Sequence, residues 1–205
     1  MRPLRAFVFS KFSKAASIQR SLASYEEKIM EQKWIDLSDT LIKAGKYYLP
    51  RLTSQLLSSR YDAGCAVIRE VPKRTGNRIE AYAALWQAYE ERLEDWMEVG
   101  TVFVSPAIAG NGVCGEIMRE IVALAPADKN LFLVTDVMPV MRAAEELRFV
   151  PVTLETFTIP IKLVRELLGP DRKIPESICP HCFSGGRRTF GVPKNGERWF
   201  FYRPA

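Results

Sequence analysis

Three glycines, Gly110, Gly112 and Gly115, lie close together at the start of a predicted helix, in the stretch SPAIAGNGVCGEIMREIVAL (105–124). An apolar run over 99–104 precedes it, so a strand would lead through a glycine loop into the helix. The first N–H groups of a helix have no partner within the helix and lie at the positive end of its dipole. Because small residues let an anion approach these amides, the stretch predicts a site for a phosphate-bearing molecule.

Predicted strands and helices alternate around this loop. Strands are indicated by apolar, β-branched and aromatic runs over 65–71, 78–87, 97–104, 130–136 and 150–160. The spacing of apolar residues predicts helices over 17–32, over 37–59 with an interruption at Pro50, over 113–124, over 139–147 and over 161–168. The strand, helix, strand unit over 97–136 implies two parallel neighbours in an otherwise antiparallel sheet.

Composition and charge indicate the class of protein. The 205 residues are 47% hydrophobic and 26% charged, which is enough for one sizeable core, or one core with a small appendage, in a soluble globular protein. The net charge of +5 suits an anionic ligand but is too small and dispersed to indicate nucleic-acid binding. Since no apolar run is long enough for a membrane span, we expect no membrane partner.

Two further features bear on localisation. The four cysteines, Cys65, Cys114, Cys179 and Cys182, do not form a spaced disulfide framework, which favours thiols in a reducing compartment. Residues 1–25 contain arginines, lysines and serines but no acidic residue, a pattern also seen in organellar transit peptides. Because this segment leads directly into the first predicted helix, we expect a cytoplasmic protein, with a targeting segment as the alternative.

The glycine loop resembles a motif of a known family. The order of elements and the segment VFVSPAIAGNGVCGEIM (102–118) resemble the acetyl-CoA-binding motif of the GNAT N-acetyltransferase superfamily. In that motif a strand ends in Val-x-Pro, and a loop of the form Gln/Arg-x-x-Gly-x-Gly/Ala opens a helix. The matching positions are Val104, Pro106, Gly112 and Val113. Ala109 stands where the family has Arg or Gln, and Cys114 stands where it has Gly or Ala.

A second landmark of the family is an aromatic-rich helix that ends in Gly-Phe. The segment MRAAEELRFVPV (141–152) is similar to it, with Phe149 in place and Arg148 instead of the glycine. The resemblance implies an α+β fold of GNAT type, with a mixed, mainly antiparallel sheet, flanking helices and a parallel strand pair splayed near Val104. We expect 1–160 to form the acyl-CoA N-acyltransferase domain, with the helix, Cys-x-x-Cys linker and β-hairpin of 161–205 packed on the same domain.

The resemblance also implies acetyl-CoA as the co-substrate and an amine as the acceptor. Backbone N–H groups of the loop would bind the pyrophosphate of coenzyme A. The pantetheine arm would lie between the parallel strands, where N–H groups of the first strand's end would also bind the thioester oxygen. The implied cofactor-binding residues are Phe103, Val104, Ala109, Gly110, Asn111, Gly112, Val113, Cys114 and Gly115. For the loop taken alone, an ordinary strand-to-helix turn is the alternative.

Direct acetyl transfer needs a base that removes the proton of the amine. Glu98, at the start of the strand 97–104, is our first candidate, and Glu155, on the strand 150–160, is the second. For each of them the alternative is a carboxylate that is solvated or ion-paired at a strand end.

The reaction also needs an acid for the departing thiolate. The family often has a tyrosine on the helix before Gly-Phe, but alignment on Phe149 places Ala144 there. We therefore expect another donor, Tyr82 or Tyr89, unless the thiolate leaves unprotonated or the chain has lost the reaction.

The C-terminal segment contains ICPHC (178–182) and the aromatic-rich stretch RTFGVPKNGERWFFYRP (188–204). One Cys-x-x-Cys pair is half of a zinc site, and His181 lies too close to bind the same ion, so we expect no metal. The alternating aromatic residues of 199–202 are typical of a strand packed on a sheet, which we favour over the stacking of nucleic-acid bases.

Together these features predict an N-acetyltransferase that transfers an acetyl group from acetyl-CoA to an amine, with a homodimer left open. One alternative is a non-catalytic, acyl-CoA-binding regulatory protein of the same fold. A more distant alternative is a zinc-stabilised nucleic-acid-binding protein that uses Cys179, Cys182 and the C-terminal arginines. The loop and strand-end groups that would bind a thioester favour the enzyme.

Overall fold

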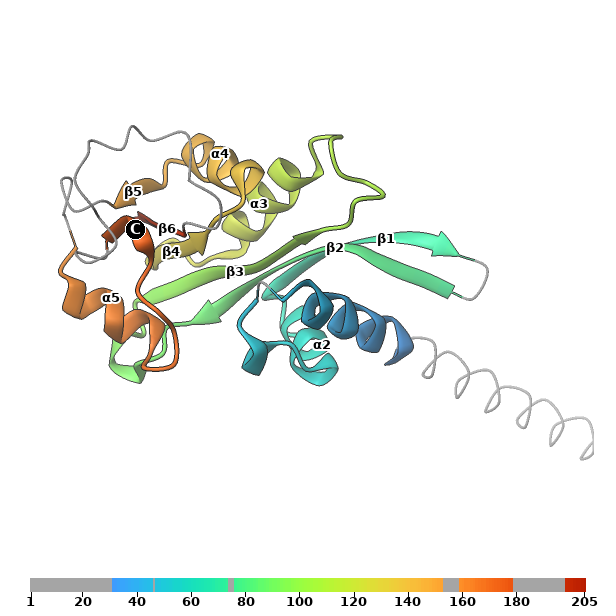
Figure 1. Cartoon of the computed structure of the whole chain (residues 1–205), viewed down its shortest axis with the longest axis horizontal. Coiled ribbons are helices and arrows are strands. Elements are labelled where there is room, and N and C mark those ends of the chain that lie inside the picture. Colours follow the sequence, from blue (N-terminus) through green and yellow to red (C-terminus); the bar gives the residue numbers. More distant parts are fainter. Residues whose placement is uncertain (1–30, 46, 74–75, 153–158, 179–197) are drawn as a thin grey trace, which may run out of the picture.

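The computed structural model describes residues 31–45, 47–73, 76–152, 159–178 and 198–205 (Figure 1). The segments outside these ranges include most of the predicted helix 17–32, the candidate base Glu155, and the pair Cys179 and Cys182. Within the described ranges, Cys65 and Cys114 are free thiols, and His, Cys, Asp and Glu side chains form no cluster that could bind a metal ion. None of the helices in these ranges has the length and apolar character needed to cross a membrane.

A six-stranded sheet in the order β1-β2-β3-β4-β6-β5 forms the centre of the described structure. Its strands are β1 (Ala66–Lys73), β2 (Gly76–Gln87), β3 (Trp96–Val104), β4 (Asn130–Thr135), β5 (Val150–Val152) and β6 (Trp199–Arg203). Only β3 and β4 pair in parallel, and the other neighbours are antiparallel. This confirms the predicted mixed sheet, in which the strand, helix, strand unit provides the parallel pair.

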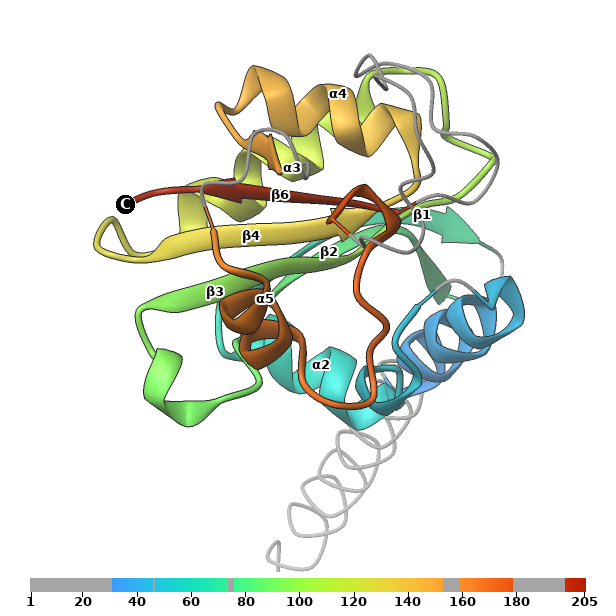
Figure 2. The same cartoon turned by 60° about the vertical axis from the view of Figure 1, so that its left-hand side comes forward.

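Helices cover both faces of this sheet (Figure 2). The helices are one over residues 31–44, α2 (Ser54–Asp62), α3 (Val113–Leu124), α4 (Met138–Glu146) and α5 (Ile161–Leu168), with 3-10 turns η1 (Leu49–Arg51), η2 (Glu91–Leu93) and η3 (Glu176–Ile178). Helices α3 and α4 pack on one face, whereas the helix 31–44 and α2 pack on β1 to β3 from the other. Helix α5 covers β4 and β6 on that second face.

Strand β6 confirms the prediction that the C-terminal aromatic residues pack on the sheet. Trp199 and Phe201 belong to the core beneath α3 and α4. Phe200 and Tyr202 pack with α5 on the opposite face. Because successive side chains of a strand point to opposite faces, one short strand contributes to both cores.

The N-terminal helices differ from the prediction, and the difference positions the site. Residues 31–44 form one helix, so the predicted boundary between 32 and 37 is wrong. The helix ends at Gly45, which has a left-handed φ of 64°, rather than continuing to Pro50. Helix α2 begins anew behind Thr53, whose side chain accepts a hydrogen bond from the N–H of Leu56. Gly45 and residues 47–53 therefore form a connection with the 3-10 turn η1 in place of the predicted α-helix.

Candidate active site

The parallel strands β3 and β4 are paired only at their beginnings. The paired residues are Trp96 with Asn130, Met97 with Leu131 and Glu98 with Phe132. Beyond them β3 stays paired with β2, and β4 stays paired with β6, so the two strands diverge. Among the described residues, the facing edges of β3 and β4 have no strand partner there. The splay that was expected near Val104 thus begins earlier, directly after Glu98.

A β-bulge in β3 lies within this splay. The pairing of β2 with β3 shifts between Tyr82 and Ala84, so that Thr101 and Val102 together lie opposite Ala83. Thr101 has a φ of 53°, a left-handed conformation that a β-branched residue rarely adopts. Strain of this kind costs on the order of 1–3 kcal/mol and is concentrated at functional sites.

A cavity of about 360 Å³ occupies the splay, a volume typical of small-molecule sites. Residues 99–102 of β3 form one wall, and residues 133–137 at the end of β4 form the other. The other lining residues are Gly45, Tyr47, Val140 and Arg198. The cavity therefore combines apolar strand walls with a few polar groups, among them the hydroxyl of Tyr47 and the carboxylate of Asp136.

The glycine loop connects β3 to the amino end of α3. Gly110 and Gly112 have φ angles of 88° and 76°, which glycine adopts without a steric penalty. The first hydrogen bond of α3 joins the N–H of Glu116 to the carbonyl of Gly112 at 3.1 Å, so the N–H groups of 113–115 have no partner within the helix. A Cβ added at either left-handed glycine would meet nothing within 4 Å. The loop is thus open to an anionic ligand at the helix amino end.

The structure separates the predicted cofactor-binding residues into two groups. Residues 109–115 lie together in the loop and the first turn of α3. Phe103 and Val104, in contrast, are paired with β2 and are not among the residues that line the cavity. The bulge at Thr101 separates them from the diverging part of β3, where 99–102 form the wall.

Tyr47 lies in the segment between the helix 31–44 and η1, and its side chain reaches the cavity. Its hydroxyl donates a hydrogen bond to the carbonyl of Val102 at 3.1 Å. Burial is the main cause that raises the pKa of Tyr47 to about 12, and the nearby Asp136 and Cys114 contribute to the shift. The phenol is therefore protonated at neutral pH, and its single O–H is donated to the Val102 carbonyl at the wall of the splay.

Asp136 directly follows β4 at the opposite wall of the cavity and is partly buried. The hydroxyl of Thr135 accepts a hydrogen bond from the N–H of Val137 at 3.0 Å, which fixes the backbone on both sides of the aspartate. A carboxylate at this place can accept the proton of an amine, directly or through a water molecule.

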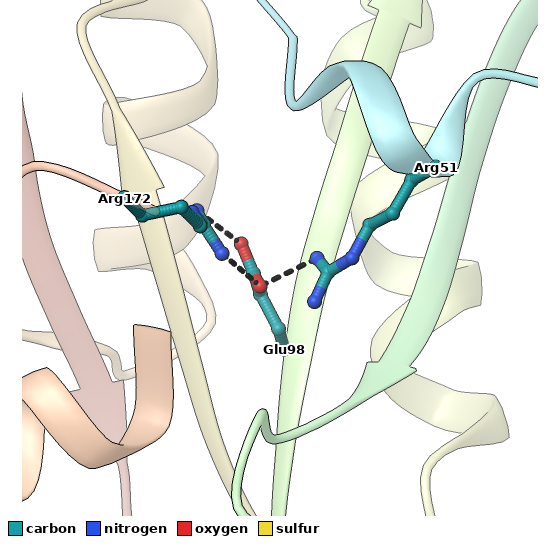
Figure 3. Close-up of polar contacts among 3 residues, drawn as sticks. All are labelled: Arg51, Glu98 and Arg172. Carbon is teal, nitrogen blue, oxygen red and sulfur yellow. Dashed lines mark hydrogen bonds and ion pairs between the residues drawn. The ribbon is translucent and has the colours of Figure 1, made fainter. Parts of the chain in front are cut away.

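Glu98 is buried at the point where β3 and β4 begin to diverge (Figure 3). Arg172 donates two hydrogen bonds to its carboxylate, at 2.6 and 2.8 Å, and Arg51 donates a third at 2.6 Å. Burial opposes ionisation, but the charges and hydrogen bonds of Arg172 and Arg51 outweigh it and lower the pKa of Glu98 to about 2. A carboxylate with this pKa is a weak base, so this environment disfavours the general-base role expected of Glu98.

Aromatic rings support the two arginines that bind Glu98. The guanidinium carbon of Arg51 lies 4.9 Å from the ring centroid of Trp86 and 5.5 Å from that of Tyr48. Arg172 also lies 5.5 Å from the Tyr48 ring. Cation–π contacts at these distances orient both guanidinium groups toward the carboxylate.

The other proton donors and acceptors expected from the sequence are not in the cavity. Tyr82 is fully buried in the core beneath the helix 31–44 and α2, where its hydroxyl donates to the carbonyl of Leu57 at 3.3 Å. Burial raises the pKa of Tyr82. Tyr89 is half-exposed next to Gly169, outside the splay. Glu155 lies outside the described residues.

Sequence reasoning missed Tyr47 and Asp136. For Asp136 the signal was present, since it ends the run NLFLVTD at the carboxyl end of the second parallel strand. Tyr47 gave no such signal, because its segment was assigned to a helix and its contact with β3 spans 55 residues of sequence.

Two solved structures are similar to this chain. One is the diaminobutyrate acetyltransferase EctA from Paenibacillus lautus, in complex with its substrate L-2,4-diaminobutyric acid and coenzyme A. Its similarity has a TM-score of 0.50 at 13% identity and covers 85% of this chain and 90% of that one. The other is Rv2747 from Mycobacterium tuberculosis in complex with CoA and NLQ, at 18% identity over 56% of this chain and 63% of that one. Its TM-score of 0.39 is too low to inform the fold of this chain.

No protein-family model matches the sequence, and no curated protein matches it. The similarity to EctA, at its low identity, bears on the fold alone.

Proposed function

Because the chain has the fold of the GNAT N-acetyltransferase superfamily, we propose that it transfers an acetyl group from acetyl-CoA to an amine. The observation that supports this most is the cavity in the splay of β3 and β4, next to the open amino end of α3. In this proposal the N–H groups of 113–115 bind the pyrophosphate, and the pantetheine arm lies in the splay. In this arrangement the free edge of β3 offers backbone hydrogen bonds to the amide groups of the arm.

Transfer begins when the lone pair of a neutral amine attacks the thioester carbonyl carbon. A C–N bond forms, the C–S bond breaks, and coenzyme A leaves as a thiolate. The amine loses one proton, which Asp136 accepts directly or through water, because Asp136 lines the cavity.

Tyr47 stabilises the leaving group in this scheme. A phenol with a pKa of about 12 does not transfer its proton completely to an alkyl thiolate, whose conjugate acid has a pKa of roughly 8.5. In this scheme the single O–H of Tyr47 turns from the Val102 carbonyl to the sulfur and donates a hydrogen bond, which strengthens as negative charge develops there.

Glu98 acts as a positioning residue rather than as a catalytic base. Its carboxylate joins η1 through Arg51 to the segment after α5 through Arg172, directly beside the last parallel strand pair. In this proposal the ion cluster of Glu98, Arg51 and Arg172 aligns β3 at the narrow end of the splay.

Release of free thiol from acetyl-CoA, measured with a panel of amines, tests the function. We expect turnover by the wild type and a fall in kcat of about tenfold to a hundredfold in Tyr47→Phe, with little change in the affinity for acetyl-CoA. Tyr61→Phe is the matched control, because Tyr61 lies in α2, where its ring contacts Trp34 outside the cavity. Its kcat is expected to equal that of the wild type.

Two results would contradict the proposal. Failure of both coenzyme A and acetyl-CoA to bind in calorimetric titration at millimolar concentration would reject the cofactor. Tight binding without turnover of any amine would instead favour the non-catalytic acyl-CoA-binding protein.

A further inference from the structure

The ion cluster at Glu98 contains more positive than negative charge. Among the described residues, Arg51 and Arg172 share Glu98 as their only ion-pair partner. Each of the two arginine side chains is only 15% exposed, and the Glu98 side chain is 4% exposed. One positive charge is therefore left without a counter-charge in a largely buried place, which costs free energy unless an anion approaches.

The two arginines differ in how fully Glu98 engages them. Arg172 uses both of its terminal nitrogens on the carboxylate, whereas Arg51 uses only Nη1. Within the described part of the chain, Nε and Nη2 of Arg51 have no hydrogen-bond partner. The planar fork of Arg51 can therefore bind a second carboxylate without releasing Glu98.

The cluster adjoins the cavity through Gly100. This glycine lines the cavity, and a Cβ placed on it would lie 3.4 Å from Glu98 Oε1 and 3.0 Å from Cδ1 of Trp86. Arg51 stacks on the same Trp86 ring. Figure 3 shows Arg51 and Arg172 approaching Glu98 from opposite sides, above the diverging strands. The unbalanced charge thus lies at the narrow end of the splay, on the face covered by η1.

Trp86 adds an unsatisfied donor to this place. Its side chain is buried, and its indole Nε1 has no hydrogen-bond partner among the described residues. Nε1 lies 3.4 Å from the position that a Cβ on Gly100 would occupy. Buried donors are normally paired, so this N–H and the free edge of Arg51 together favour an acceptor group from a ligand.

We propose that the amine acceptor carries a carboxylate, and that Arg51, supported by Arg172 and Trp86, binds this carboxylate beside Gly100, at the wall of the cavity. The substrate class is an amino acid or another amine with an acidic group. The inference rests on the proposed function and specifies its acceptor. Binding of the carboxylate there leaves the amine end of the acceptor in the cavity, where the thioester carbon would lie.

Matched acceptors test this inference. The probes are glycine, β-alanine and 4-aminobutyrate, each compared with its carboxamide, in which a neutral amide of similar shape replaces the carboxylate. Initial rates of thiol release give kcat/KM for each acceptor, with wild type, Arg51→Met and Arg51→Lys. Arg51→Met is the milder way to remove one charge, because Glu98 keeps its two hydrogen bonds to Arg172.

For the wild type we expect at least one acid to exceed its amide by tenfold or more in kcat/KM. In Arg51→Met the kcat/KM of the acid is expected to differ from that of its amide by no more than about threefold, mainly because KM for the acid rises. The calorimetric affinity for coenzyme A is expected to stay unchanged. Arg51→Lys keeps the positive charge but not the planar fork of donors. Its preference for the acid is therefore expected to lie between those of the wild type and Arg51→Met. Butyrate is expected to compete with the acceptor, whereas butyramide is not.

Equal use of acids and amides by the wild type, or an acid preference that survives in Arg51→Met, would overturn the inference and leave the proposed function intact. Absence of coenzyme A binding, or of all amine turnover, would instead reject the proposed function and this inference with it.

Discussion

Two ionisable side chains at the splay are held in opposite protonation states by their surroundings. Burial near negative charge keeps Tyr47 protonated, with a pKa of about 12. Two guanidinium groups keep Glu98 ionised despite full burial, with a pKa of about 2. Residue type alone suggested Glu98 as the base, but two arginines hold its carboxylate in ion pairs. The protonated phenol of Tyr47, in contrast, lines the cavity.

The ionised state of Glu98 predicts how stability depends on pH. The pKa of this carboxyl falls from its ordinary value of 4.5 to about 2 on folding, so the folded state favours the ionised form. Its stabilisation is complete above the unfolded-state pKa and is lost as the pH falls from about 5 toward 2. Glu98→Gln is expected to lose about 3 kcal/mol at pH 7, because it leaves two buried arginines without a counter-charge. Urea unfolding between pH 7 and pH 2.5 measures both effects.

Glu120→Gln provides the control for Glu98→Gln. Glu120 pairs with Arg69 on the exposed side of α3, where such a pair contributes at most about 1 kcal/mol. If Glu98→Gln and the wild type lose stability in parallel below pH 5, Glu98 is not the group responsible for the acid dependence.

At the scale of elements, the carboxyl end of α4 shows why the family pattern has a glycine where this chain has Arg148. Arg148 has a φ of 65°, in the left-handed region. The N–H of Arg148 bonds to the carbonyl of Glu145 at 2.9 Å, and the N–H of Phe149 bonds to that of Ala144 at 2.9 Å. These two bonds form a Schellman motif, whose left-handed position glycine occupies without strain.

Replacing Arg148 should therefore stabilise the protein. We expect Arg148→Gly to raise the free energy of unfolding by about 0.5–1 kcal/mol, because glycine removes the left-handed penalty but adds entropy to the unfolded chain. Chemical denaturation at neutral pH measures the change. Arg148→Ala retains a Cβ and is expected to bring no gain; an equal gain in both variants would assign the effect to loss of the arginine side chain instead.

The sequence was sufficient to predict the elements whose signals are local. Strand β3, the glycine loop and α3 could be predicted from an apolar run, closely spaced glycines and helical spacing of apolar residues within one stretch of chain. Two of these glycines, Gly110 and Gly112, have a positive φ in the structure. The packing of β6 followed from the alternation of its aromatic residues.

Elements and contacts that depend on distant partners could not be predicted in this way. The hydrogen bonds of Glu98 join residues 47 and 74 positions apart in sequence, and no local pattern indicates such partners. The segment 45–53 was read as helix because its apolar residues continue a helical spacing, but Gly45 ends the helix. Its polar residues, Tyr47 and Arg51, were missed for that reason.

At the scale of the whole molecule, the splay exists because β3 and β4 are each paired with another strand over more residues than with each other. Strand β3 follows β2 along most of its length, and β4 follows β6, so the two halves of the sheet twist apart after three parallel pairs. Helices α3 and α4 cover the splay on one face, and the segment 45–53 approaches it on the other. The site is thus an opening in the sheet itself, which long-range pairing produces and which no single element encodes.

The crystal structure of the protein with coenzyme A tests this account most directly. We predict that the pantetheine arm lies between β3 and β4, against 99–102, and that the pyrophosphate accepts hydrogen bonds from the N–H groups of 113–115. Coenzyme A bound outside the splay, or an ordered complex in which the N–H groups of 113–115 make no contact with the pyrophosphate, would contradict it.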